Sequence, residues 1–340
     1  MGVDISNILE KKSISLEELN GKRLAIDAFN TLYQFLTIIR QPDGTPLMDS
    51  KGRITSHLTG LFYRTCNLLE KNIHPVFVFD GAPSELKART ISERSEAKKE
   101  AEKQRITALR EGNIERAGSL AQRTARLTKE HVGQAKQLLD LMGVPHVQAA
   151  SEGEAQCAAM AKQGLVNAAA SQDYDTLLFG APLLVRNLTI AGKRKLPRTK
   201  TFTEVLPEEI NLEENLNKLQ LTREKLIWIG MLCGTDFNEG IHGIGPKKSL
   251  KLVQKHNKFD DILQEIEKEM DWKPVYDLFA HPPEIEVKKT DIAQREPNRD
   301  GIVKFMHDEF EFSLDRVQNA IQRAFKEPED SNQSQLKKWF

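Results

Sequence analysis

Cysteine is scarce in this 340-residue chain, and aromatic residues make up only 6% of it. The three cysteines, Cys66, Cys157 and Cys233, stand far apart without a C-x-x-C pair. This excludes a disulfide framework and a cysteine zinc site, and it fits a reducing compartment. No run approaches the ~20 apolar residues of a membrane span, and the N-terminus has no signal-peptide pattern. We therefore expect an intracellular protein of the cytoplasm or nucleoid, with no membrane partner.

An excess of charge of one sign is also lacking, since Lys+Arg and Asp+Glu number 49 each. The distribution is more informative than the total. Residues 85–136 hold thirteen Lys and Arg against eight Glu and few large apolar residues. We predict two helices, broken at residues 111–113, that project from the body. A solvated, salt-bridged helical hairpin is the plain alternative, and the position directly after Asp80 favours a role in handling substrate.

Five short runs rich in Val, Ile, Ala and Phe predict buried strands at residues 23–28, 75–79, 144–148, 167–170 and 183–188. They lack strict alternation, which suits a parallel sheet covered on both faces. Amphipathic stretches between them predict helices, for example at residues 57–71 and 131–142, and Gly143 is placed to cap the second. The succession of strands and helices along the chain predicts an α/β fold with a mostly parallel central sheet flanked by helices.

Seven carboxylates stand where a strand should end or a helix begin, and no histidine or cysteine in their motifs offers itself as a softer ligand. They are Asp27, Asp80, Glu152, Glu154, Asp173, Asp175 and Asp236. Acids that follow parallel strands are expected to meet in the crevice at the carboxyl ends of the sheet. So many like charges repel one another unless hard divalent cations neutralise them. The pattern predicts an acidic Mg²⁺ or Mn²⁺ cleft of the kind that hydrolyses phosphodiesters.

Taken singly, these acids have plainer explanations. Asp27 is suited to cap a helix, and Asp80-Gly81 reads as an ordinary turn. Ser151-x-x-Glu154 has the form of a capping box, which explains Glu154 without a metal. The repetition of a strand followed by an acid favours one joint site over these separate explanations.

A glycine-rich segment follows Asp236 and a predicted helix at residues 222–233. Gly240, Gly243 and Gly245 alternate with hydrophobic residues and precede two lysines, Lys247 and Lys248. This spacing predicts a helix–hairpin–helix module whose backbone N–H groups contact the phosphates of a duplex without reading its bases. The alternative is a glycine-rich turn between core helices.

A second basic cluster occupies a predicted loop that is marked by Gly and Pro and holds no acids. Its members are Lys193, Arg194, Lys195, Arg198 and Lys200. Contact with phosphate and a merely solvated loop are both open readings of this cluster.

In chain order, five strings carry a family resemblance: AIDAFNTLYQFL, VFVFDGAP, SEGEAQCA, ASQDYDTLLFG and GTDFNEGIHGIGPKKSL. They closely resemble the flap endonucleases of the structure-specific 5′ nuclease superfamily, and the likeness, archaeal in type, covers nearly the whole chain. It implies a PIN-like 5′ nuclease fold with a helical arch and a helix–hairpin–helix module. It also implies a Mg²⁺-dependent 5′ flap endonuclease and 5′-3′ exonuclease. Such an enzyme cuts branched DNA near the single-strand/double-strand junction and leaves a ligatable nick in Okazaki fragment maturation and base excision repair.

The length alone suggests about two domains or one large domain with insertions. The resemblance divides the chain further: an N-terminal nuclease region at residues 1–98, an arch at 85–136, an internal nuclease region at 116–258 that includes the hairpin module at 222–256, and a C-terminal helical region at 259–330. Residues 38–61 match the family's wedge and its pocket for a one-nucleotide 3′ flap.

The resemblance assigns roles to single residues. It implies that Asp27, Asp80, Glu152 and Glu154 serve one Mg²⁺, that Asp173, Asp175 and Asp236 serve a second, and that Mn²⁺ can substitute. Lys87 and Arg94 match cations at the base of the arch that contact the scissile phosphate. Tyr33 matches an aromatic on which an unpaired base stacks, with Arg40 on the same helix; without the family Tyr33 reads as a core residue. Gly2 matches a position near the active site, and a monovalent cation is expected at residues 240–245.

The C-terminal residues 331–340 form the last motif. Gln333, Leu336, Trp339 and Phe340 resemble the motif that binds the sliding clamp PCNA, and a tail folded onto its own body is the alternative. Two exposed aromatics at a chain end otherwise favour aggregation, so a partner is the simpler explanation. We expect a monomer. The competing functions are a related gap-directed or processive 5′-3′ exonuclease, and a clamp-tethered junction binder without catalysis.

Overall fold

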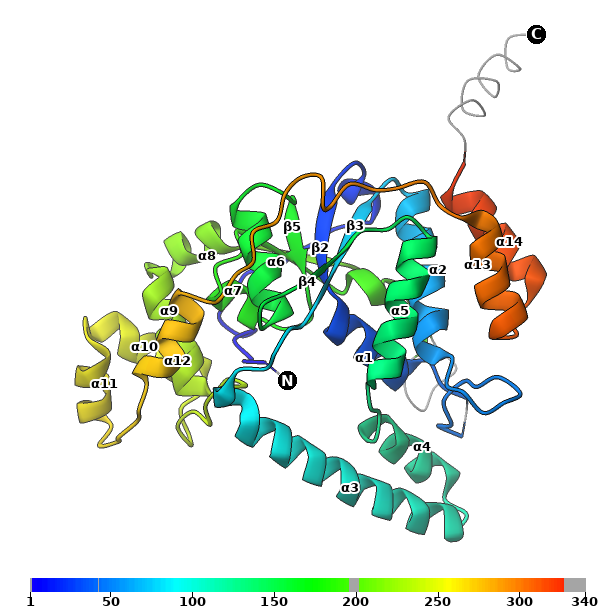
Figure 1. Cartoon of the computed structure of the whole chain (residues 1–340). Coiled ribbons are helices and arrows are strands. Elements are labelled where there is room, and N and C mark those ends of the chain that lie inside the picture. The colour runs from blue at the N-terminus through cyan, green and yellow to red at the C-terminus, as the bar shows by residue number, and fades with distance from the viewer. Residues whose placement is uncertain (1, 42, 196–201, 327–340) are drawn as a thin grey trace.

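A mixed seven-stranded sheet forms the centre of the protein (Figure 1). The computed structural model describes residues 2–41, 43–195 and 202–326. The strand order is β1-β9-β6-β5-β2-β3-β4, and the strands from β6 to β4 run parallel. Their bounds are β1 Lys12–Ser13, β2 Arg23–Asp27, β3 His74–Phe79, β4 His146–Gln148, β5 Ala168–Ala170, β6 Leu183–Arg186 and β9 Glu208–Asn211. The five predicted strands are therefore confirmed, and β1 and β9 are antiparallel additions at one edge.

Both faces of the sheet are buried, as the lack of strict alternation predicted. Leu24, Ile26, Phe77 and Phe79 face one core cluster, while Ala25, Val76 and Val78 face another. The first cluster packs against α1 Ala28–Ile38, α2 Ser56–Glu70, α5 Lys129–Leu141, α13 Arg299–Val303 and α14 Leu314–Ala324. The second packs against α6 Gly153–Lys162, α7 Asp175–Leu178, α8 Leu212–Leu219, α9 Arg223–Cys233, α10 Pro246–Lys255, α11 Phe259–Glu265 and α12 Lys273–Ala280.

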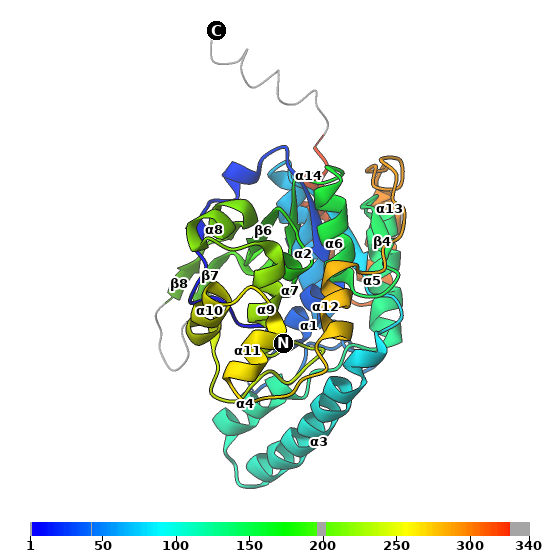
Figure 2. The same cartoon turned by 90° about the vertical axis from the view of Figure 1, so that its left-hand side faces the viewer.

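Two helices stand apart from these layers, below the body in Figures 1 and 2. They are α3 Ala88–Arg110 and α4 Ile114–Arg123, separated at the predicted residues 111–113. The 23-residue α3 buries only Ala101 and Ala108, so it cannot be held by a core of its own. Its far end is held instead by α4, which returns to the body and packs against residues 43–44. The two helices form the predicted arch.

The predicted loop around the second basic cluster is wrong in part. Lys193, Arg194 and Lys195 belong to β7 Gly192–Lys195, which pairs antiparallel with β8 Phe202–Val205. Backbone hydrogen bonds pair the two strands, and the run Gly-Lys-Arg-Lys has no hydrophobic pattern that would mark a strand. Arg198 and Lys200 lie outside the described residues, as do Gln333, Leu336, Trp339 and Phe340.

The described residues include all three cysteines and most of the predicted helices. All three cysteines are free thiols. No described helix combines the length and apolar character needed to cross a membrane.

Candidate active site

The acids meet because four parallel strands end at one edge of the sheet. Asp27 ends β2, Asp80 follows β3, and Asp173 follows β5. The fourth strand, β4, leads to Glu152 and Glu154 at the start of α6. Because β4, β3, β2 and β5 are adjacent in the sheet, their carboxyl ends form one crevice.

Two glycines hold the Asp80 and Glu152 segments together, and sequence reasoning gave neither a role. Gly81 donates its N–H to the Ser151 carbonyl at 2.6 Å, and a Cβ at Gly81 would lie 2.2 Å from the Ala149 carbonyl oxygen. Gly153 donates its N–H to Asp80 Oδ1 at 2.9 Å. A Cβ there would lie 2.7 Å from the same oxygen. Any larger residue would separate the two carboxylate segments.

Asp27 is both a helix cap and a member of the acidic cleft. Its Oδ1 accepts the backbone N–H of Asn30 at 3.0 Å and so caps α1. Its Oδ2 lies 3.4 Å from the hydroxyl of Ser171, which also lies 3.1 Å from Glu154 Oε1. The capping alternative for Asp27 is correct, and it is compatible with a place in the cleft.

The capping-box explanation of Glu154 is wrong. Helix α6 begins after Glu152, and no side chain caps it. The Glu154 carboxylate bonds Ser171 instead. Ser151 provides its carbonyl to Gly81, so the motif served the packing of two loops rather than a helix end.

The remaining acids approach from the other side of the crevice. Asp173 Oδ2 accepts the side-chain amide of Asn30 at 2.8 Å, a contact that sequence reasoning did not foresee. Asp175 Oδ1 accepts the backbone N–H of Val3 at 2.8 Å. A Cβ at Gly2 would lie 2.8 Å from the Asp175 carboxyl carbon, which places the N-terminal segment directly at the site.

Burial and mutual repulsion alter the protonation of these acids. Burial, with the charge of Asp80, raises the pKa of Asp27 well above its usual value. Burial, with the charge of Asp173, does the same to the pKa of Glu154. Such shifts are the cost of holding like charges together away from water.

The same effect extends to both ends of the cluster. Burial and nearby Glu152 raise the pKa of Asp80 to about 6. Burial, with the charges of Asp173 and Asp236, raises the pKa of Asp175 to about 7. Every one of the seven acids is thus within electrostatic reach of another, and the structure brings the predicted set together.

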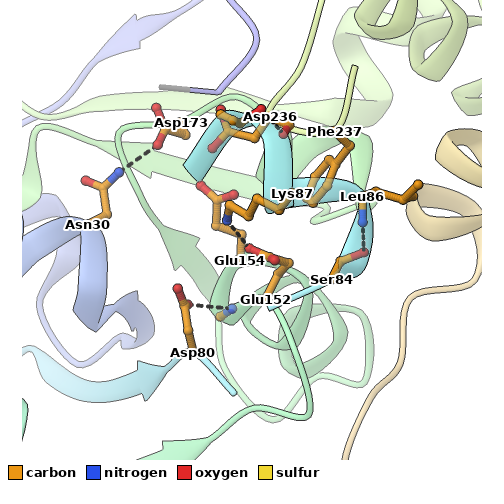
Figure 3. A network of polar contacts seen from close by, with 12 residues as sticks. Asn30, Asp80, Ser84, Leu86, Lys87, Glu152, Glu154, Asp173, Asp236 and Phe237 are labelled. Atoms are coloured by element: carbon orange, nitrogen blue, oxygen red, sulfur yellow. Dashed lines mark hydrogen bonds and ion pairs between the residues drawn. The ribbon is translucent and has the colours of Figure 1, made fainter. Parts of the chain in front are cut away.

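Two cations at the base of the arch contact this cluster: Lys87, directly before α3 (Figure 3), and Arg94 within α3. Lys87 pairs with Glu152 and lies 5.6 Å from the centre of the Phe237 ring. Burial opposes the charge of Lys87, but Glu152 beside it outweighs burial and raises the pKa of the lysine. Arg94, further along α3, pairs with Asp236. The base of the arch therefore sits on the acids, as predicted from sequence order.

The donor set suits divalent cations. The clustered groups are carboxylates, whose hard oxygen ligands suit Mg²⁺ and Mn²⁺, and their repulsion is the imbalance that such a cation would relieve. Within the described ranges, however, no group of three or more His, Cys, Asp or Glu side chains converges closely enough to hold a metal ion. Lys87 and Arg94 instead occupy oxygens of Glu152 and Asp236.

The other predicted DNA-binding residues differ in their surroundings. Tyr33 is half-buried on α1, and the ammonium group of Lys98 from the arch lies 4.8 Å from its ring centre. It is therefore not a closed core residue. Arg40 donates to the carbonyls of Leu36 and Gly44 at 2.9 and 2.8 Å, which secures the end of α1.

The glycines of the predicted hairpin separate into two kinds. Gly240 has φ +70°, and a Cβ there would lie 2.4 Å from the Gly234 nitrogen, so it serves packing against the end of α9. A Cβ added at Gly243 or at Gly245 would have no described atom within 4 Å. They precede α10, on which Lys247 and Lys248 are exposed. The predicted order of helix, hairpin and helix is confirmed.

Comparison with known proteins decides the family. The XPG N-terminal domain matches residues 1–101, and the XPG I-region matches residues 143–236. Flap endonuclease 1 of Pyrococcus furiosus is 53% identical over 343 residues, a match that covers 100% of this chain and 99% of that protein. The chain belongs to the flap endonuclease 1 family.

Further relatives of this flap endonuclease agree. Flap endonuclease 1 of Thermococcus onnurineus is 51% identical over 100% of this chain and 99% of its own. The solved flap endonuclease-1 of Methanococcus jannaschii is 41% identical with a TM-score of 0.73, covering 95% of this chain and 98% of that chain. The catalytic core of Rad2 in complex with DNA substrate has a TM-score of 0.68 at 25% identity. The match covers 93% of this chain and 96% of that chain. The predicted fold class and nuclease activity are confirmed: the protein is a flap endonuclease, a hydrolase of a metal-dependent family, and the non-catalytic alternative is not favoured.

We expect the stabilisation of this flap endonuclease by Mg²⁺ to grow as pH rises from 6 to 8. Since the pKa of Asp175 is about 7 and that of Asp80 about 6, protons neutralise the cluster at the lower pH and compete with the cation. Above these values the charged cluster costs stability, which a bound cation restores. Thermal unfolding with Mg²⁺ or with EDTA at each pH measures the difference.

Burial lowers the pKa of His57 to about 3. Its effect on Tm is the same with Mg²⁺ and with EDTA, so it cancels in the difference between them. A Mg²⁺-dependent increase in Tm that is as large at pH 6 as at pH 8 would contradict a carboxylate metal cluster.

Proposed function

We propose that this flap endonuclease hydrolyses the phosphodiester at the base of a 5′ flap with two divalent cations held by the seven carboxylates. The observation that carries the proposal is that the seven acids lie within electrostatic reach of one another at one crevice, where two cations of the arch pair with Glu152 and Asp236. The first group would be Asp27, Asp80, Glu152 and Glu154, and the second would be Asp173, Asp175 and Asp236, partly through water.

When bound, the two cations would supply Lewis-acid stabilisation of the phosphate and an activated water. The chain's own contribution is orientation. Gly153 N–H fixes Asp80, Ser171 links Asp27 to Glu154, and Val3 N–H fixes Asp175. These contacts fix the orientation of the carboxylates. The products would be a 5′ phosphate and a 3′ hydroxyl.

Lys87 and Arg94 would exchange partners during the reaction. Both pair with acids of the cluster. Glu152 and Asp236 would help hold the cations in place of these ion pairs, and the lysine and the arginine would then be available to the scissile phosphate. Positive groups placed where negative charge develops stabilise a transition state.

The DNA would engage three surfaces. Open glycines Gly243 and Gly245, with Lys247 and Lys248, would contact the backbone of the bound duplex, where a monovalent cation would assist. Tyr33 would stack an unpaired base near the cleft, with Arg40 near by, while residues 38–61 receive the 3′ flap. The displaced strand would pass under α3 and α4. Rad2, a solved relative of similar fold, is described in complex with a DNA substrate, which supports a DNA path of this kind.

The proposal also includes partners and place in the cell. Gln333, Leu336, Trp339 and Phe340 would bind the sliding clamp PCNA and hold the monomeric enzyme at replicating and repaired DNA in the cytoplasm or nucleoid. The five-part division of the chain, with the nuclease regions at 1–98 and 116–258, the arch at 85–136, the helical region at 259–330 and the tail at 331–340, belongs to the same proposal.

A cleavage assay tests this function most directly. A 5′-labelled double-flap DNA should be cut near its junction when Mg²⁺ is present and left whole in EDTA. Equal turnover on a nicked duplex and on a bubble would instead favour a gap-directed or processive exonuclease. No cut near the junction in Mg²⁺ would overturn the proposal.

We expect Gly245→Ala to weaken duplex binding several-fold without lowering Tm. Gly245 has φ −100°, which alanine accepts, and its Cβ position is open, so the methyl group would obstruct only an approaching phosphate. One lost hydrogen bond is worth about 1 kcal/mol, or roughly fivefold in affinity. Fluorescence anisotropy with labelled duplex measures the change.

Gly240→Ala is the contrast for this experiment. Its Cβ would collide with Gly234, so Tm should fall. If Gly245→Ala binds duplex as the unaltered protein does, the hairpin does not contact phosphate through this residue.

A further inference from the structure

Asn30 is a neutral residue among the seven acids, and no motif gave it a function. It lies in the first turn of α1, three residues after Asp27. Its backbone N–H donates to Asp27 Oδ1 at 3.0 Å, and its side-chain amide donates to Asp173 Oδ2 at 2.8 Å (Figure 3). One residue thus contacts two carboxylates that come from different strands.

The two acids belong to different halves of the cleft. Asp27 ends β2 and Asp173 follows β5, the neighbouring parallel strand. In the proposed function Asp27 serves the first cation and Asp173 the second. Of the contacts described above, Ser171 bonds carboxylates of the first group and receives only the backbone N–H of Asp173. Asn30 instead bonds one carboxylate of each group.

The chemistry of an amide suits this position. A lysine or arginine there would neutralise the acids and compete with a cation, whereas an amide N–H orients a carboxylate and leaves its charge in place. A donor on Oδ2 of Asp173 leaves Oδ1 for other contacts. Groups that hold metal ligands in this way tune metal affinity, and losing one typically costs ~10–100-fold in affinity or activity.

The support of Asn30 is rigid. Helix α1 is fastened to the core by Ala28, Leu32, Phe35 and Leu36, all buried. Its N-terminal end is fixed by the Asp27 cap itself. The separation of the two bonded carboxylates is therefore set by a short, stiff piece of backbone and one side chain.

We propose that Asn30 is a positioning residue that sets the spacing between the two carboxylate groups, and hence between the two cations. This inference rests on the proposed two-cation function. It predicts that a side chain without a donor at position 30 leaves the first cation bound and weakens the binding of the second cation.

The test is a Mn²⁺ titration of the full chain, followed by electron paramagnetic resonance, which counts bound ions and detects the coupling of a close pair. Asn30→Leu, similar in size but without a donor, should keep the tighter Mn²⁺ site. It should weaken the other site ~10–100-fold and lose the signal of the coupled pair. Asn30→Asp keeps the shape of the side chain, and because it places a further acid against Asp173 without donating, it should lose the pair signal as well.

Gln34→Leu is the matched control. Gln34 lies one turn further along α1 and is also half-buried, and its amide oxygen accepts a bond from Thr189 at 2.9 Å. It should bind two Mn²⁺ ions as the unaltered protein does. Thermal unfolding in EDTA identifies any variant that fails to fold.

The outcomes separate the two proposals. Two coupled Mn²⁺ ions in folded Asn30→Leu, with the affinities of Gln34→Leu, would overturn the role of Asn30. A single Mn²⁺ ion in the unaltered protein would overturn the two-cation function itself.

Discussion

Asp80→Asn should lose flap cleavage by at least about a thousandfold while the folded protein becomes more stable in EDTA at pH 8. Loss of a ligand removes Lewis-acid stabilisation worth several kcal/mol, and each 1.4 kcal/mol is a factor of ten in rate. The asparagine keeps an oxygen for Gly153 N–H but removes one of the repelling charges. Single-turnover cleavage and thermal unfolding measure the two effects.

The opposite directions of these effects make the result specific. A variant that merely unfolded would lose activity and stability together. Asp261→Asn, an exposed acid on α11, is the control and should change neither. Anisotropy should show flap DNA still bound by Asp80→Asn. A normal cleavage rate in that variant at saturating Mg²⁺ would remove Asp80 from the reaction.

Lys87→Met should reduce the rate of cleavage by ~10²–10³-fold, the usual cost of losing one positive group or donor at a developing negative charge. Lys87 is the partly buried cation nearest the acids, where water screens charge weakly. The methionine keeps the apolar length of the side chain and removes its charge. We expect the loss in the chemical step, so single-turnover rates on a 5′ flap are the measurement.

Lys103→Met provides the comparison elsewhere in the arch. Lys103 lies on α3, 79% exposed and only 4.0 Å from Glu100. It should alter flap affinity slightly and the chemical step not at all. Lys87→Arg, which keeps the charge, should retain more activity than Lys87→Met. Equal losses in the two methionine variants would show that general charge on the arch matters and that Lys87 has no special place.

Much of the site was predictable because it follows from local order along the chain. Six of the acids come shortly after a predicted strand or at a helix start, and parallel strands must bring such positions to one edge. Asp236 instead follows the end of α9. The arch was predictable for a similar reason, since a charged stretch with few apolar residues has nothing to bury. Gly243 and Gly245 likewise carry their signal in their spacing.

The misses have physical causes too. Glu154 matched a capping box by its spacing from Ser151, but a helix end is decided by which residue first adopts helical geometry, and α6 begins after Glu152. Strand β7 is polar, so nothing in its composition marked it. Asn30 and Ser171 had no signal at all, because an amide or hydroxyl is ordinary on any surface and gains meaning only from what lies opposite.

The sequence by itself determined the α/β fold, the seven acids and the basic helices that follow Asp80, because hydrophobic periodicity and charge are properties of neighbouring residues. Only the tertiary structure decided which groups share the crevice with those acids. Lys87 and Arg94 pair with Glu152 and Asp236 across long sequence separations, and Asn30 reaches Asp173 from the first turn of α1. Such contacts depend on the packing of whole elements, which no local pattern encodes.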